Sequence, residues 1–204
     1  MSITILDPSE AKRHRRAVWG GRERFTECWN GREVVPPLPN NEHAQLSFLF
    51  GAPLLDAVVR PGSGVASGPA NVSDRADGWD TNYRGPDVLV YLNGNPAVNH
   101  GTHWQGGPDF LVEILSRGER PKAKFRFYAA INTREVLLVH RRRTWALELY
   151  QLRAGALEPA GRSTLADPAV LVSAVLPLTF QLVAGPERPQ LLVARPADGR
   201  TWLV

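Results

Sequence analysis

Runs of apolar residues, separated by turn-forming residues, predict a series of short strands along this chain. Segments 87–92 (DVLVYL) and 109–115 (DFLVEIL) are rich in Val, Leu, Ile and Phe, which is typical of buried strands. Segments 135–140 and 145–150 have the same character. Strands this apolar are normally covered on both faces, so we expect a mixed sheet with a helix on each side.

Two segments carry the signals of helices. Apolar residues recur at helical spacing from Leu46 to Val59, after an asparagine cap at position 40 or 41, and Gly51 and Pro53 predict a kink. A second helix is expected over 121–131, with proline at the first position, where a missing backbone donor costs little.

The rest of the chain predicts loops and short strands. Segment 61–85 is small and polar and predicts one long loop. Asp198-Gly199 predicts a turn between the last two strands. Shorter strands are expected at 32–35, 171–183, 191–193 and 201–204. The pattern as a whole predicts one α+β domain with a mixed β-sheet flanked by helices.

Composition narrows the class of protein. The chain has 204 residues, of which 43% are hydrophobic and 22% charged, as in soluble globular proteins. A single cysteine, Cys28, excludes a disulfide scaffold and cannot hold a structural zinc alone. The longest apolar stretch, 169–180, is too short and too polar to cross a bilayer, and the N-terminus lacks a signal-peptide core. We therefore expect a cytoplasmic protein with no membrane partner.

Positive charge is concentrated in two runs. The net charge is +4, and basic residues cluster at 12–16 and at Arg141, Arg142 and Arg143. Such runs favour contact with phosphate backbones, so the three arginines are candidate nucleic-acid-binding residues. The alternative is an ordinary solvated surface.

Acidic residues inside apolar strands are the most informative feature. In an extended strand, Leu111, Glu113 and Leu115 share one face, while Val112 and Ile114 point to the other. A lone buried carboxylate costs several kcal/mol, so Glu113 should be paired, protonated or bound to a cation. The same reasoning applies to Asp87 at the start of the neighbouring strand.

An Asp, a Glu on the next strand and a nearby Lys are typical of Mg²⁺-dependent phosphodiester hydrolysis. Two carboxylates hold the cation and leave room for water and phosphate. A lysine ammonium positions the nucleophile and offsets the phosphate charge. Here Lys124 follows Glu113 by 11 residues and would come from the following helix. The alternative is a structural salt bridge between strand carboxylates and a basic residue.

The order of motifs resembles the Uma-two family of restriction-endonuclease-like proteins, a branch of the PD-(D/E)XK nuclease superfamily. The matching segments cover roughly residues 25–185. They are ECWNGREVVPPLPNNEHAQL, GPDVLVYL, PDFLVEILS, KFRFYAAINTREVLLV, LELYQL and VLPLTFQL. The resemblance implies a restriction-endonuclease-like domain at 25–185, a basic arm or helix at 1–24 and a C-terminal hairpin extension at 186–204.

The resemblance also implies roles for individual residues. Asp87 and Glu113 would be the catalytic carboxylates that bind Mg²⁺, or Mn²⁺ in its place, with the Ile114 carbonyl as a further ligand. Lys124 would be the catalytic lysine, carried by the helix in phase with Tyr128, and Glu27 a further acid from the N-terminal region.

Two classes of function follow from these residues and the resemblance. The first is a Mg²⁺-dependent endonuclease, a hydrolase acting on the phosphodiester bonds of DNA and acting as a homodimer. The alternative is a non-catalytic nucleic-acid-binding or interaction protein on the same fold, in which the acidic positions are structural. A zinc site built from His100, His103, His43 and Cys28 is disfavoured, because no second ligand pair has the required spacing.

Overall fold

The computed structural model describes residues 4–5, 26–36, 39–116, 120–141 and 144–204. All but two residues of the predicted basic arm (1–24), together with Arg142 and Arg143, therefore lie outside the described residues. No helix of the described chain is long and apolar enough to cross a membrane.

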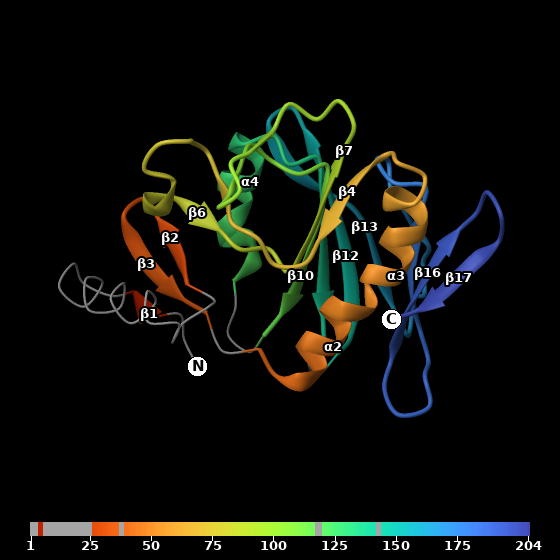
Figure 1. The fold of residues 1–204 in the computed structure, drawn as a ribbon. Helices are drawn as coiled ribbons and strands as arrows, with labels where there is room; N and C mark the ends of the chain where they lie inside the picture. Colours follow the sequence, from red (N-terminus) through yellow and green to blue (C-terminus); the bar gives the residue numbers. More distant parts are fainter. Residues whose placement is uncertain (1–3, 6–25, 37–38, 117–119, 142–143) are drawn as a thin grey trace.

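A six-stranded mixed sheet forms the centre of the fold (Figure 1). Strands β10 and β11 run parallel, and the other neighbours in the sheet are antiparallel. The strand order is β13 (Ala156–Thr164), β12 (Ala146–Arg153), β11 (Glu135–His140), β10 (Phe110–Leu115), β7 (Val88–Leu92) and β4 (Gly64–Ser67).

Helices cover both faces of this sheet, as the sequence predicts. On one face lie α2 (Asn41–Leu49), α3 (Gly51–Leu54) and a π-helix (Leu55–Val59), and on the other lie a 3-10 helix (Pro121–Lys124) and α4 (Phe125–Ala130). Figure 1 shows α4 on one side of the central strands and α2 and α3 on the other.

Alternation along β10 divides the core into two clusters. Phe110, Val112 and Ile114 pack with the α2 side, whereas Leu111 packs with Tyr128 of α4. All six residues of β10 are buried. The predicted two-sided burial of this strand is therefore confirmed, and Glu113 lies on the α4 face.

Two further sheets, one of four strands and one of seven short strands, flank the centre. The C-terminal sheet has the order β14 (Leu171–Val172), β15 (Thr179–Val183), β16 (Gln190–Arg195) and β17 (Arg200–Leu203). The other has the order β1 (Thr4–Ile5), β3 (Arg32–Val35), β2 (Glu27–Trp29), β6 (Tyr83–Arg84), β5 (Val72–Ser73), β9 (Trp104–Gln105) and β8 (Val98–Asn99). The division of the chain near residues 24 and 185 stays a prediction.

Asparagine and glycine residues form the turns and helix ends that the sequence predicts. Asn30 and Gly31 both have positive φ (50° and 79°), which is the requirement of the tight turn between β2 and β3. The Asn40 side chain accepts a hydrogen bond from the His43 N–H at 3.0 Å and caps α2. Asn132, with φ of 64°, follows the end of α4.

Two expectations about strands were wrong. Segment 61–85 contains β4, β5 and β6 rather than one loop, because pairing with neighbouring strands holds segments that have almost no apolar pattern of their own. Gly64 shows the reason: a Cβ there would lie 2.3 Å from the Tyr91 carbonyl oxygen. Strand β13 was not predicted, since its sequence ALEPAGRST has no apolar alternation, yet it pairs with the whole of β12.

Candidate active site

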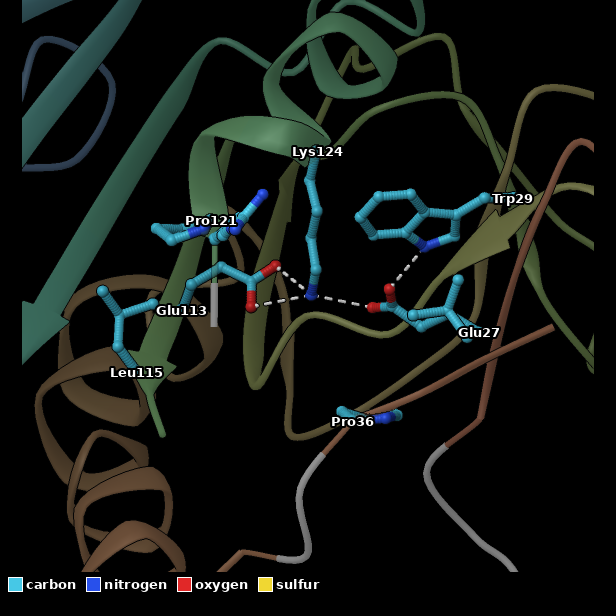
Figure 2. Close-up of a pocket in the computed structure, with 9 residues that line it drawn as sticks. Glu27, Trp29, Pro36, Glu113, Leu115, Pro121 and Lys124 are labelled. Carbon is cyan, nitrogen blue, oxygen red and sulfur yellow. Dashed lines mark hydrogen bonds and ion pairs between the residues drawn. The ribbon is translucent and has the colours of Figure 1, made fainter. Parts of the chain in front are cut away.

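Strands β2 and β10 and the helical segment that leads into α4 bring three charged side chains, Glu27, Glu113 and Lys124, together on the α4 face of the sheet. The Lys124 ammonium donates to both oxygens of Glu113, at 3.0 and 3.1 Å, and lies 2.8 Å from Oε1 of Glu27 (Figure 2). The Tyr128 hydroxyl donates to Oε1 of Glu113 at 2.5 Å. Lys124 and Tyr128 are one helical turn apart, so both reach the same carboxylate.

Glu27 is fixed from the opposite side by β2 and its neighbours. The Trp29 indole N–H donates to its Oε2 at 2.8 Å, and the Gly85 N–H donates to its Oε1 at 3.0 Å. Figure 2 shows the Glu27 and Glu113 carboxylates on either side of the Lys124 ammonium. The lysine therefore bridges the N-terminal sheet and the central sheet.

Burial and crowded negative charge determine the protonation of this cluster. Burial raises the pKa of Glu113 to about 7; Asp87 and Glu27 add to the rise, and Lys124 and Tyr128 only partly offset it. Burial also acts to raise the pKa of Glu27, but the Lys124 charge and the hydrogen bonds to Glu27 lower it overall. Burial opposes the charge of Lys124, yet its two carboxylates raise its pKa.

Asp87 lies immediately before β7, beside the end of β10. Its Oδ2 accepts the Ile114 N–H at 2.6 Å, and its Oδ1 lies 2.7 Å from Nε2 of His43 on α2. In an extended strand the N–H and C=O of one residue point to the same edge, so the Ile114 carbonyl also faces the Asp87 side.

A cleft of about 730 Å³ opens onto these groups. Asp87, Glu113, Lys124 and Glu27 line it together with His43 and with the exposed Phe48 of α2. This volume lies within the range of about 300–1,000 Å³ that is usual for small-molecule sites. The four predicted site residues thus share one solvent-connected space.

The oxygen atoms present suit a hard divalent cation. Each oxygen of Asp87 accepts one hydrogen bond, as does Oε2 of Glu113, and a carboxylate oxygen has two acceptor positions. Within the described residues, no group of three or more His, Cys, Asp or Glu side chains is arranged to hold a metal ion. Mg²⁺ commonly takes one or two carboxylates and completes its shell with water and phosphate, so two carboxylates and a carbonyl fit it.

Comparison with known families identifies the group to which this site belongs. A family model described as "Uma2: Putative restriction endonuclease" matches residues 15–185. The chain belongs to the Uma2 family. The predicted resemblance is therefore confirmed.

A solved structure supports the Uma2 assignment at the level of the fold. A crystal structure described as "a putative nuclease belonging to DUF820" from Anabaena variabilis ATCC 29413 superposes with a TM-score of 0.54 at 16% sequence identity. The match covers 73% of this chain and 80% of that one. The predicted restriction-endonuclease-like α+β core is confirmed by this likeness. The comparison with curated proteins gave no match.

Of the predicted nucleic-acid-binding arginines of this Uma2 chain, the structure describes Arg141, which does not line the cleft. Arg141 is 6% exposed; it donates to Glu42 at 2.8 Å and to the Ser116 hydroxyl at 3.3 Å. This corrects the expectation that Arg141 is accessible to a phosphate backbone, because its guanidinium is turned inward to a carboxylate. Arg142 and Arg143 fall outside the described residues.

Sequence reasoning missed the contact between His43 and Asp87. The signal was present: His43 occupies the same helical face as the buried Leu46, and a polar side chain on such a face needs a partner. The other residues of the disfavoured zinc site lie elsewhere. His100 and His103 stack on each other at 4.8 Å, and the Cys28 thiol donates to the Thr81 carbonyl.

Proposed function

We propose that this Uma2 protein is a Mg²⁺-dependent endonuclease that hydrolyses phosphodiester bonds in DNA. The observation that carries the proposal is the convergence of Asp87, Glu113 and Lys124 on one cleft, from two strands and a helix. Membership of a family described as restriction endonucleases supports a nuclease in particular. The overall charge of +4 is compatible with a polyanionic substrate.

In this proposal Asp87, Glu113 and the Ile114 carbonyl hold the cation. When bound, Mg²⁺ would activate water and stabilise the charge that develops on the phosphate. Lys124 would place its ammonium against the scissile phosphate or the attacking water. Glu27 holds Lys124 between two carboxylates, and the Tyr128 hydroxyl fixes the orientation of Glu113.

Lys124 must change partners for this role. Its ammonium has three N–H donors, and within the described part of the chain its ion pairs and hydrogen bonds are to Glu27 and Glu113. If Glu113 turned one of its oxygens to a cation, Lys124 would lose part of that contact and would have an N–H donor free for the substrate. The ion pair thus holds the lysine ready beside the metal ligands.

Cleavage of supercoiled plasmid, single-stranded circular DNA and RNA in Mg²⁺ or Mn²⁺ tests the proposal. We expect cleavage of DNA that EDTA stops and that Glu113→Gln abolishes. Glu158→Gln is the matched control, because Glu158 is an exposed glutamate of β13 that does not line the cleft, so this variant should retain full activity. Cleavage that persists in Glu113→Gln protein or in EDTA would contradict the assignment.

One observation favours the second candidate, a non-catalytic nucleic-acid-binding protein. The charges of Lys124 and its two carboxylates already form a closed network without a cation. Asp87→Ala separates the two functions: a nuclease loses metal binding and cleavage, whereas a binding protein keeps its DNA affinity or gains some from reduced repulsion.

Homodimerisation is a further part of the proposal, since a duplex has two strands to cut. Sedimentation at micromolar concentration should show a dimer, and a monomer would contradict it.

A further inference from the structure

A line of hydrogen bonds leads from Asp87 away from the cleft into the protein. Nε2 of His43 lies 2.7 Å from Oδ1 of Asp87, and Nδ1 of His43 lies 3.4 Å from the Ser116 hydroxyl. The same hydroxyl oxygen accepts from Arg141 at 3.3 Å, and Arg141 donates to Glu42 at 2.8 Å.

Topology explains why these residues meet. Strands β10 and β11 are parallel, and Leu115 pairs with His140, so the next residues on each strand, Ser116 and Arg141, emerge side by side. Helix α2 crosses this end of the sheet and contributes both Glu42 and His43. His43 and Arg141 are 8% and 6% exposed, so water competes little for these bonds.

The partners define the direction of each bond. An ionised carboxylate can only accept, so Nε2 of His43 carries a hydrogen and donates it to Asp87. In a neutral imidazole Nδ1 is then the acceptor for the Ser116 hydroxyl, whose oxygen in turn accepts from Arg141. With the Ile114 N–H on its other oxygen, Asp87 is held by one donor at each oxygen.

Resting on the proposed function, we propose that His43 is a positioning residue for the metal ligand Asp87, and that Ser116 and Arg141 hold the His43 ring in place. When both oxygens of a carboxylate are held by donors, its remaining acceptor positions keep one direction. Less conformational entropy is then lost when a cation binds. Arg141 thereby acts inside the protein, in place of the phosphate contact that its basic run suggested.

Calorimetric titration with Mn²⁺ tests this role without needing a substrate. We expect His43→Leu to weaken Mn²⁺ binding by about 10-fold or more, the usual range for loss of an outer partner of a metal ligand. His43→Gln should recover most of that loss, because its amide N–H can replace Nε2–H. His100→Leu is the matched control: His100 is exposed and bonds to Gln105, so binding should not change.

Ser116→Ala provides a second variant that leaves His43 in place. Ser116→Ala removes the hydroxyl that connects the imidazole to Arg141. It should weaken Mn²⁺ binding measurably, but less than His43→Leu does. Thermal unfolding of each variant shows that the protein titrated is folded. If His43→Leu does not fold, Ser116→Ala and His43→Gln carry the test.

The outcomes distinguish the two proposals. If wild type binds Mn²⁺, Asp87→Ala does not, and His43→Leu binds as wild type does, the metal site stands and the positioning role is overturned. Failure of His43→Gln to restore binding overturns the hydrogen-bond explanation. If wild type itself binds no Mn²⁺, the proposed function fails, and the positioning role with it.

Discussion

Two buried glutamates on neighbouring parallel strands show different ways of keeping a carboxylate inside a protein. Glu113 on β10 and Glu135 on β11 are 6% and 1% exposed. Glu135 accepts from three neutral donors, the Ser173 hydroxyl, the Ala174 N–H and the Gln151 amide. Glu113 instead has Lys124 and Tyr128 as partners, with two further carboxylates nearby.

The surroundings of the two residues lead to different roles. Glu135 holds residues 173–174 against the start of β11 through hydrogen bonds. Its neutral donors stabilise the carboxylate without a cation. Glu113 lines the large cleft, and burial raises its pKa, with the charges of Asp87 and Glu27 adding to the rise. Burial of an acid is therefore not sufficient to indicate a site; like charges gathered at a cleft are the distinguishing feature.

The sharpest test exchanges each glutamate for its amide. Glu113→Gln should reduce DNA cleavage by at least about 1,000-fold, because it removes a metal ligand and its charge from the reacting centre. Glu135→Gln should leave the cleavage rate of the folded protein unchanged. Equal losses in the two variants, measured on the plasmid substrate, would remove the distinction between them.

Lys124→Met should destabilise the fold by about 3 kcal/mol at pH 7, because it leaves buried carboxylates without their cation. Since the Lys124 charge lowers the pKa of Glu27 and Glu113, its loss raises the pKa of Glu113 further above its value in the unfolded chain and raises that of Glu27 from its lowered value. A raised folded-state pKa gives stability that is complete at low pH and is lost as pH rises.

The loss of stability caused by Lys124→Met, relative to wild type, should therefore be smaller at pH 5 than at pH 7. Urea unfolding of variant and wild type at both pH values measures it. If the loss of stability were the same at pH 5 and pH 7, its cause would be lost packing and not unpaired charge.

Ser173→Ala tests the structural glutamate. It removes one of the three donors of Glu135 and should lower the free energy of unfolding by about 2 kcal/mol, the cost of leaving a buried acceptor short of a partner. Mn²⁺ affinity should match that of wild type. A change in Mn²⁺ affinity would mean that the Glu135 region and the cleft are coupled.

Arg162→Gln should change the free energy of unfolding least among these substitutions. Arg162 lies 3.5 Å from Glu148, and its side chain is 60% exposed. An exposed pair of this kind contributes less than about 1 kcal/mol, so chemical denaturation should detect almost no change. A larger loss would show that charges on β12 and β13 contribute to the sheet.

The sequence was sufficient for the parts of the fold that depend on apolar periodicity. Strands β7, β10, β11 and β12 and the kinked helical segment from α2 onward were predictable because burial dictates their residues. Strands β4 and β13 were not, because they are held by pairing along sheet edges, which leaves little trace in residue type.

For the candidate site too, the sequence predicted the features set by local spacing and missed those set by long-range packing. Strand alternation placed Glu113 on a buried face, and helical phase brought Lys124 and Tyr128 to it. The contact of His43 with Asp87 and the inward turn of Arg141 depend on how α2 crosses the ends of β10 and β11. That long-range geometry is not encoded in local spacing.

Calorimetric titration of the wild-type protein and of Asp87→Ala with Mn²⁺ tests the central claim, that the cleft carboxylates bind a divalent cation. We predict saturable binding to wild type that Asp87→Ala loses. No binding to wild type, or unchanged binding in Asp87→Ala, would contradict the claim and leave these carboxylates as structural partners of Lys124 and His43.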